Sequence, residues 1–325
     1  MRKTRIILLC LVIFLLIYLT VVSAEIVFRS DSQLPKAILQ KQDQPRLVLI
    51  TQDTETPFWD KVGKGAEDQA HHEGASLEVW GSYGKNHEDF LKKLEIAIHS
   101  KIDGIIIQGL DSEEFTYLTK VKASFYGIPI ITIANDVPMQ ESLRRTYVGS
   151  DQYKAGQMIA NQLISDMGTT GNVILTYSSN EEYYQKQRLD GIKDTLEKFP
   201  SIKTVLAETS SEREQIITTT QDMLNKNPNI DAFIIVNSNI VGDLVNEIGK
   251  RSQIAPYHIY SFDEGPDSLS LLTNGQLDGI VEQSPEKMGQ TSVKLIMDWL
   301  NGDTLPLDLN GYFTPIRILK ATDVQ

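Results

Sequence analysis

The sequence of 325 residues contains a single cysteine, Cys10. One cysteine excludes an internal disulfide and any cluster of thiolate metal ligands. No G-x-G-x-x-G or P-loop pattern follows an expected strand, so nothing indicates a phosphate-binding loop. The expected strand ends also lack the serine–histidine or cysteine–histidine combination that nucleophilic catalysis requires. The sequence therefore predicts no enzyme, no metal site and no cofactor.

Basic residues are also in the minority. Lysine and arginine number 31 against 43 aspartate and glutamate, and the formal net charge is −12. No basic stripe interrupts this acidity, so a phosphate backbone would be repelled and nucleic acid is not an expected partner. We interpret the acidity mainly as a source of solubility.

The N-terminus has the pattern of an export signal, since Arg2, Lys3 and Arg5 precede an apolar stretch at residues 6–22. Val22-Ser23-Ala24 fits a cleavage site. However, the apolar stretch is longer than the roughly 7–15 residues usual in a signal and approaches the roughly 20 of a spanning helix. We favour an uncleaved anchor on the extracytoplasmic face of the cell membrane, with cleavage and secretion or periplasmic release as the alternative.

From residue 46 onward, short apolar runs alternate with helical patterns. Strands are expected at residues 47–51, 77–80, 104–108, 129–133, 172–177, 203–207, 232–237, 258–262 and 279–282. Helices are expected at residues 58–73, 88–99, 152–167, 184–199, 212–224, 240–250 and 285–300. Strands that are apolar throughout and alternate with helices are typical of parallel sheets covered on both faces. The fold class is therefore α/β, with two successive doubly wound lobes.

Ligands of open parallel sheets bind beyond the carboxyl ends of the strands. The residues just past the expected strands are amides, carboxylates and aromatics: Thr56, Phe58 and Trp59, then Asn135 and Asp136, then Asn237, Asp263 and Gln283. Hydroxyl groups need several hydrogen-bond partners, and the C–H faces of a sugar stack on aromatic rings. This set of residues suits a neutral polyhydroxylated ligand.

Each of these residues has a simpler interpretation as well. Phe58 and Trp59 could pack into the core at the start of a helix, and Asn237 and Asp263 could be N-caps. Gln283 could be an ordinary loop residue.

Arg188 lies within an expected helix but has no acidic residue three or four positions away, so no helical ion pair explains it. We assign it to the ligand, with a solvated surface arginine as the alternative. On this assignment, replacing it should leave stability nearly unchanged. We interpret Glu181-Glu182, just before this helix, as a solvated loop.

Residues 46–324 resemble the type I periplasmic sugar-binding proteins, the ribose-binding group related to the ligand-binding cores of LacI-type repressors. The resemblance rests on "TETPFWDKVGKGAED", "GIPIITIANDVP", "YVGSDQYKAGQMIA", "QRLDGIK", "IIVNSN", "IYSFDEGPDS" and "GIVEQSPEKMGQ", in this order and spacing. It implies two lobes joined by a three-crossover hinge near Ser150, Gln283 and Tyr312. The implied segments are a signal or membrane anchor at 1–24, a tether at 25–45, an N-terminal lobe at 46–150 plus 284–311, and a C-terminal lobe at 151–283 plus 312–325.

The resemblance also implies roles for individual residues. Phe58 and Trp59 match the aromatic pair that sandwiches the sugar, and Arg188 matches the arginine that binds ring and hydroxyl oxygens. Asn237, Asp263 and Gln283 match the remaining hydroxyl partners. Thr56 stands where ribose binders have asparagine, and Ala134-Asn135-Asp136 where the family often has adjacent Asp-Arg. These departures put ribose itself in doubt.

The function implied is an extracytoplasmic monosaccharide receptor, with a pentose such as xylose as the expected ligand. It would close on the sugar and signal to a membrane partner, a sensor histidine kinase. The alternative is the substrate-binding component of a sugar ABC importer, with a permease as partner. A sugar-responsive transcription factor would need a DNA-binding headpiece before residue 46, where the sequence has the apolar segment instead.

Overall fold

The computed structural model describes residues 13–22, 44–54, 56–82, 86–178, 182–250, 257–264 and 267–324. The chain forms two compact units, Met1–Gln44 and Pro45–Gln325. In the first unit, residues 13–22 are helical, and the Thr20 hydroxyl donates to the carbonyl of Ile17 at 2.8 Å. The rest of the predicted anchor (1–24) and nearly all of the predicted tether (25–45) lie outside the described residues. Within the described ranges, no helix combines the length and the apolar content needed to cross a membrane.

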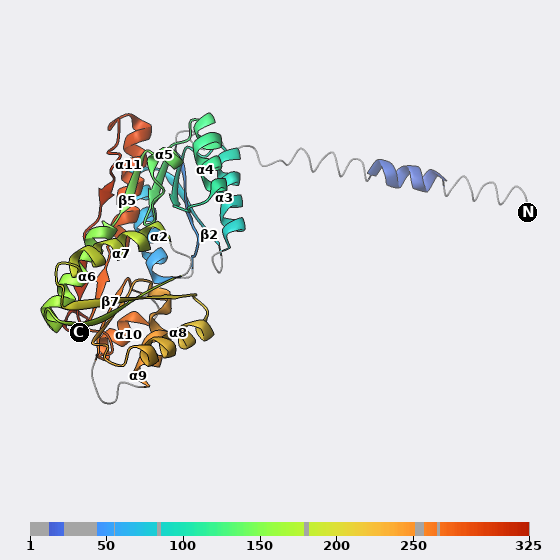
Figure 1. Cartoon of the computed structure of the whole chain (residues 1–325). Helices are drawn as coiled ribbons and strands as arrows, with labels where there is room; N and C mark the ends of the chain where they lie inside the picture. Colours follow the sequence, from blue (N-terminus) through green and yellow to red (C-terminus); the bar gives the residue numbers. More distant parts are fainter. Residues whose placement is uncertain are drawn as a thin grey trace, which may run out of the picture. The chain divides into compact units, whose positions relative to one another are not determined.

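The second unit contains two sheets of six strands each (Figure 1). The first sheet has the order β11-β5-β4-β3-β1-β2, and all its pairings are parallel. Its strands are β1 (Arg46–Thr51), β2 (Ser76–Gly81), β3 (Gly104–Gln108), β4 (Ile130–Ile133), β5 (Thr146–Gly149) and β11 (Tyr312–Phe313). Its helices are α2 (Pro57–Glu73), α3 (His87–His99), α4 (Glu113–Thr116), the π-helical η1 (Tyr117–Ala123), α5 (Met139–Ser142) and α11 (Pro285–Asn301). We call this sheet with its helices the N-terminal lobe.

Alternating side chains of the first sheet supply two separate cores. Leu47 and Leu49 of β1 pack with α2 and α11 on one face, while Val48 and Ile50 pack with α3, α4 and η1 on the other. Because both faces are covered, the strand is apolar at every position from 47 to 50.

The second sheet has the order β12-β10-β9-β8-β6-β7 and is parallel except that β12 runs antiparallel to β10. Its strands are β6 (Gly171–Ser178), β7 (Ile202–Thr209), β8 (Ala232–Ile235), β9 (His258–Phe262), β10 (Gly279–Glu282) and β12 (Arg317–Leu319). Its helices are α6 (Gln152–Met167), α7 (Tyr183–Leu196), α8 (Arg213–Lys226), the 3₁₀ turn η2 (Ser238–Ile240), α9 (Val241–Gly249), α10 (Ser268–Thr273) and the 3₁₀ turn η3 (Ala321–Asp323). This is the C-terminal lobe.

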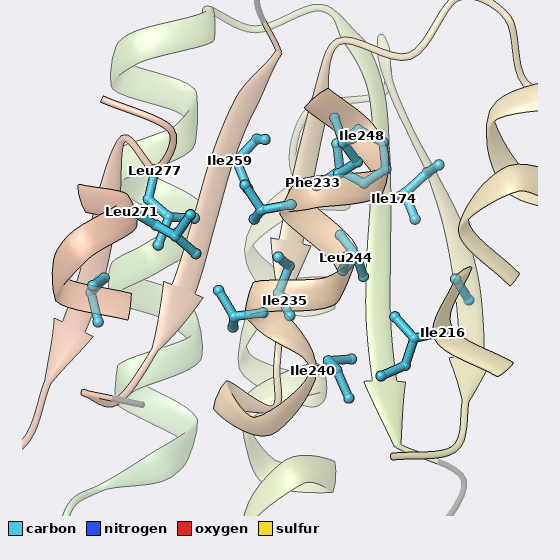
Figure 2. Close-up of a cluster of buried hydrophobic side chains, with 14 of the residues drawn as sticks. Ile174, Ile216, Phe233, Ile235, Ile240, Leu244, Ile248, Ile259, Leu271 and Leu277 are labelled. Carbon is cyan, nitrogen blue, oxygen red and sulfur yellow. The ribbon is translucent and has the colours of Figure 1, made fainter. Parts of the chain in front are cut away.

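The C-terminal lobe also has a core on each face of its sheet. Figure 2 shows the core on the side of α9, where Phe233 and Ile235 of β8 lie near Leu244 and Ile248. On the other face, α6 and α7 cover Val173, Leu175 and their neighbours. The prediction of two doubly wound α/β lobes is confirmed.

The chain passes between the two sheets three times. It crosses from β5 to α6 at residues 150–151, returns from β10 to α11 at residues 283–284, and crosses again from β11 to β12 at residues 314–316. The sequence predicts crossings near Ser150, Gln283 and Tyr312. In the structure, Tyr312 and Phe313 pair with β5 and so belong to the first sheet. The strands β5, β11 and β12 were not predicted, and the last two are only two and three residues long.

Candidate ligand-binding cleft

A cleft between the lobes is lined by residues that follow strands of both sheets. The space between the lining side chains, open solvent at its mouth included, amounts to about 790 Å³. The structure brings together seven of the nine residues predicted as ligand contacts: Thr56, Phe58, Trp59, Asn135, Arg188, Asp263 and Gln283.

The start of α2 forms the aromatic side of the cleft. The Thr56 hydroxyl accepts a hydrogen bond from the Trp59 backbone N–H at 3.3 Å, and Pro57 occupies the first helical position. The rings of Phe58 and Trp59 are perpendicular, with centroids 5.3 Å apart. Trp59 is 8% exposed and belongs to the core of the N-terminal lobe, whereas Phe58 is half-buried. The core therefore fixes the Trp59 ring, and both rings line the cleft.

Four side chains form a closed ring of hydrogen bonds on the C-terminal side. Arg188 Nε donates to Gln152 Oε1 at 2.8 Å, and Gln152 Nε2 donates to Gln283 Oε1 at 3.2 Å. Gln283 Nε2 donates to Asp263 Oδ1, and the Arg188 guanidinium binds both oxygens of Asp263, at 2.9 and 3.1 Å. Gln152 and Gln283 lie at the first two crossings, so the ring joins the hinge to α7 and to the end of β9.

The Arg188 guanidinium is fixed almost completely by its surroundings. Besides the ring of hydrogen bonds, Nη1 donates to the carbonyl of Val236 at 3.1 Å. The Tyr184 and Phe262 rings lie 4.8 and 4.4 Å from its central carbon. Four of its five N–H groups are thus used, and one Nη2 hydrogen remains for a ligand in the cleft.

This geometry corrects two expectations about Arg188. Its side chain is 1% exposed, so the solvated alternative is wrong. The expectation that its removal would leave stability unchanged also fails on physical grounds, because Asp263 would lose the cation that compensates its partly buried charge. The partner lies 75 positions away, where helical spacing cannot reveal it.

Asp136 lies outside the cleft lining. Its carboxylate binds Arg144 through both oxygens, at 2.6 and 2.7 Å, and accepts the Thr132 hydroxyl at 2.6 Å. The predicted ligand role of Asp136 is therefore corrected to a structural ion pair within the N-terminal lobe.

Asn237 is also absent from the lining. It is 2% exposed, and its side-chain oxygen accepts the backbone N–H of Asn239 at 3.0 Å, which caps the turn η2. The capping interpretation is the one that the structure supports. The residues after it, Ser238 and Asn239, line the cleft in its place.

Sequence reasoning missed several residues of the cleft: Gln52, Asp53, Gln108, Gln152, Glu182, Tyr184 and Glu264. Glu182 is the clearest correction, because it lines the cleft and accepts a hydrogen bond from Asn135 Nδ2 across the lobes at 3.0 Å. The sequence did place Glu182 on a loop after an expected strand and before an expected helix, which is where ligand contacts are expected. Gln152 could have been found from its position just past the expected hinge at Ser150.

Two residues of the cleft have left-handed backbones at matching places. Ala134 follows β4 with φ 63°, and Asp263 follows β9 with φ 62°. Each strand is third in the order of its sheet. The backbone N–H of Ala134 donates to Val148, and that of Asp263 to Val281, both at 2.9 Å. Unusual backbone at non-glycine residues concentrates at functional sites, and here it occurs in both lobes.

The described side chains of the cleft suit the binding of polar groups. Among the described residues, no group of three or more histidine, cysteine, aspartate or glutamate side chains could hold a metal ion. Burial, reinforced by the nearby charge of Glu182, raises the pKa of Tyr184, so its hydroxyl stays neutral. Amides, carboxylates, a guanidinium and aromatic rings supply hydrogen bonds and stacking surfaces, which is the chemistry of recognition.

Comparison with known proteins agrees with this geometry. The sequence profile of the periplasmic binding protein domain matches residues 47–304. The D-allose-binding periplasmic protein of Escherichia coli is 22% identical over 286 residues, which cover 84% of this chain and 91% of that protein. The xylose/arabinose-binding protein XylF of Sulfolobus acidocaldarius is 23% identical over 280 residues, covering 82% and 68%.

Solved structures show the same fold. GanP, a glucose-galactose binding protein from Geobacillus stearothermophilus, superposes with a TM-score of 0.80 at 27% identity, covering 87% of this chain and 99% of that one. A structure described as the XylFII-LytSN complex matches with a TM-score of 0.74 at 27% identity, covering 86% and 99%. The chain therefore belongs to the type I periplasmic sugar-binding proteins, a family of binding receptors and not of enzymes.

Proposed function

We propose that this protein is an extracytoplasmic monosaccharide receptor that closes on its sugar and reports the bound state to a membrane partner. The observation that carries the proposal is the hydrogen-bonded ring of Arg188, Asp263, Gln283 and Gln152 in the same cleft as the Phe58–Trp59 pair. The ring offers charged and amide partners for hydroxyl groups, and the aromatic pair offers a surface for C–H faces.

Closure follows from the position of this ring at the hinge. A sugar that contacts the aromatic pair in one lobe and Arg188 in the other stabilises the arrangement that brings both together. Two contacts already join the lobes, Asn135 with Glu182 and Lys61 with Glu264. The ligand adds to these contacts only when the lobes are close.

The ligand we propose to test first is a pentose such as xylose. The relatives named above bind allose, xylose or arabinose, and glucose or galactose by their names. These names support an aldose, while Ala134 and Thr56 distinguish this cleft from the ribose pattern.

The partner we propose is a sensor histidine kinase in the same membrane, with the N-terminal segment as anchor. The XylFII-LytSN complex supports a protein partner, because by its description a structural relative assembles with a second protein. The alternative is delivery to a sugar ABC importer. It is favoured by relatives named as import binding proteins, such as the ribose import binding protein RbsB of Escherichia coli, 21% identical over 272 residues.

Thermal unfolding of the full-length chain in mild detergent tests the receptor function. The chain would be heated with xylose, arabinose, ribose, allose, glucose and galactose in turn. A sugar at a hundred times its dissociation constant should add about 2.7 kcal/mol to the free energy of unfolding, a shift of several degrees. Asn237→Asp, at a capping residue outside the cleft, should respond to the same sugars. No shift with any sugar would refute the receptor function.

Crosslinking in the native cells distinguishes the two partners. A tagged full-length chain would be crosslinked with and without the sugar identified above, and its products identified by mass spectrometry. Sugar-dependent recovery of a histidine kinase supports the sensor. Recovery of a permease in its place would overturn the sensor and establish the importer.

A further inference from the structure

Asn135 presents an unsatisfied acceptor in the cleft. Its side chain lines the cleft and is 5% exposed, and both hydrogens of Nδ2 are used, by the carbonyl of Gly109 at 2.9 Å and by Glu182 Oε2 at 3.0 Å. Because both of these partners are acceptors, the amide orientation is fixed. Oδ1 is buried and accepts no hydrogen bond from any described residue. A buried acceptor of this kind requires a donor.

Glu182 lies beside this acceptor and carries charge. It belongs to the C-terminal lobe and precedes α7, whereas Asn135 follows β4 in the N-terminal lobe. The two side chains are hydrogen-bonded across the cleft, so a ligand group that donates to Asn135 Oδ1 and to the Glu182 carboxylate contacts both lobes. An ionised carboxylate and an amide oxygen can only accept hydrogen bonds. This end of the cleft therefore selects a donor.

The charges around the cleft favour a cationic donor. The described lining includes four carboxylates, those of Asp53, Glu182, Asp263 and Glu264, and a single cation, Arg188. Arg188 is bound to Asp263, and Lys61 at the cleft edge is bound to Glu264. An anionic group of the ligand at this end of the cleft would be repelled by the Glu182 carboxylate, and like charges repel strongly in a confined space.

We propose, resting on the sugar-receptor function above, that Asn135 Oδ1 and the Glu182 carboxylate form an acceptor subsite that ranks sugars by charge. An ammonium group binds there most tightly, a hydroxyl binds less tightly, and a carboxylate or phosphate is rejected. The ligand class is thus neutral and amino sugars, with amino sugars preferred. Charge-assisted hydrogen bonds are roughly twice as strong as neutral ones, which sets the direction of the ranking.

Isothermal titration of the full-length chain tests this ranking. Glucose would be compared with 2-amino-2-deoxyglucose, 6-amino-6-deoxyglucose and glucuronate, and galactose with its matching derivatives, at a pH where the amines are protonated. One amino sugar should bind roughly tenfold more tightly than its neutral parent, the gain of one charged hydrogen bond. The uronates should bind at least roughly tenfold more weakly, since repulsion replaces that hydrogen bond.

Glu182→Gln removes the charge and keeps an acceptor for Asn135. It should abolish the preference for the amino sugar, and the neutral parent should lose less affinity than the amino sugar does, because its hydroxyl forms the weaker bond to the carboxylate. Glu264→Gln is the matched control, because it removes a different carboxylate of the same lining. It should keep the preference. If both variants lost the preference for the amino sugar equally, the preference would come from the summed negative charge of the cleft, and the proposed subsite would be wrong.

The outcomes separate this inference from the receptor function. If neutral sugars bind and their amino derivatives bind no better, the subsite is wrong and the receptor function stands. If neither neutral nor amino sugars bind, both the receptor function and the subsite are wrong.

Discussion

Each lobe contains one buried arginine–aspartate pair after a central strand, and only one of the two lines the cleft. In the N-terminal lobe, Arg144 binds Asp136, and the two side chains are 6% and 13% exposed. In the C-terminal lobe, Arg188 binds Asp263, at 1% and 17%. The chemistry is the same in both lobes, so the difference lies in the remaining partners.

Those partners explain why the roles diverge. Asp136 is completed by Thr132, and Arg144 donates to the carbonyl of Leu309 at 3.0 Å, so that pair is satisfied within its own lobe. The Arg188–Asp263 pair extends instead to Gln152 and Gln283 at the hinge. We propose that this ion pair recognises the ligand because it lies where the chain crosses between the lobes.

Replacing either arginine by alanine should have the largest effect on stability. Arg188→Ala and Arg144→Ala should each lower the free energy of unfolding by about 3–5 kcal/mol, because each leaves a carboxylate without its cation. Only Arg188→Ala should also abolish sugar binding. Urea unfolding measures the first effect and isothermal titration the second.

A double replacement controls for misfolding of the single arginine variants. Arg188→Met combined with Asp263→Leu removes both charges and should recover part of the stability, as apolar replacement of a buried pair often does. Leucine at φ 62° and the acceptors that Arg188 leaves unpaired limit the recovery. It should still bind no sugar. Binding retained in the double variant, or lost in a folded Arg144→Ala, would remove the distinction between the two pairs.

Each lobe also has one close crossing of helices at glycines. A Cβ at Gly191 of α7 would lie 2.1 Å from the carbonyl oxygen of Tyr153 in α6, and one at Gly289 of α11 would lie 2.1 Å from that of Val62 in α2. Gly191→Ala and Gly289→Ala should each lower the free energy of unfolding by about 1–3 kcal/mol through overpacking. Gly249→Ala meets no atom within 4 Å and should raise it by up to about 1 kcal/mol.

The affinity for the sugar should also differ between the two glycine variants. Gly191 lies three residues after Arg188 on the same helix, so displacement of α7 moves the guanidinium directly. α11 supplies no described residue of the cleft. Titration should therefore show a larger loss of affinity for Gly191→Ala than for Gly289→Ala, and the reverse order would mean that the N-terminal lobe positions the ligand.

Much of this architecture could be predicted from the sequence, because apolar runs and helical periodicity reflect the two-sided burial of each sheet. The long elements were predicted closely; α6, for example, spans Gln152–Met167 as expected. The strands β11 and β12 were missed because a segment of two or three residues is too short to show a periodic pattern.

The site was harder to predict where a role depends on distant partners. Strand-end positions selected Asp263 and Gln283, which line the cleft, but the same rule selected Asp136 and Asn237, whose bonds are local. Glu182 was dismissed as a solvated loop residue because nothing in the sequence shows that Asn135 lies opposite it. In each case, the sequence does not show which of several candidate partners the side chain binds.

The smallest effect concerns the matching left-handed residues Ala134 and Asp263. Ala134 carries only a methyl group, so Ala134→Gly removes the conformational penalty of a side chain at φ 63° and loses little packing. The penalty of roughly 1–2 kcal/mol is partly offset by the greater backbone freedom of glycine when unfolded, so stability should rise by up to about 1 kcal/mol.

Lys101→Gly is the matched control, because Lys101 is exposed and has φ 50°. It should give a similar gain in the free energy of unfolding, measured with urea. Ala134→Gly should change the affinity for the sugar and Lys101→Gly should not, because Ala134 lines the cleft and Lys101 does not. If only Ala134→Gly lowered the free energy of unfolding, the methyl group of Ala134 would pack in the closed cleft. The N-terminal lobe would then use this position in the cleft, as the C-terminal lobe uses Asp263.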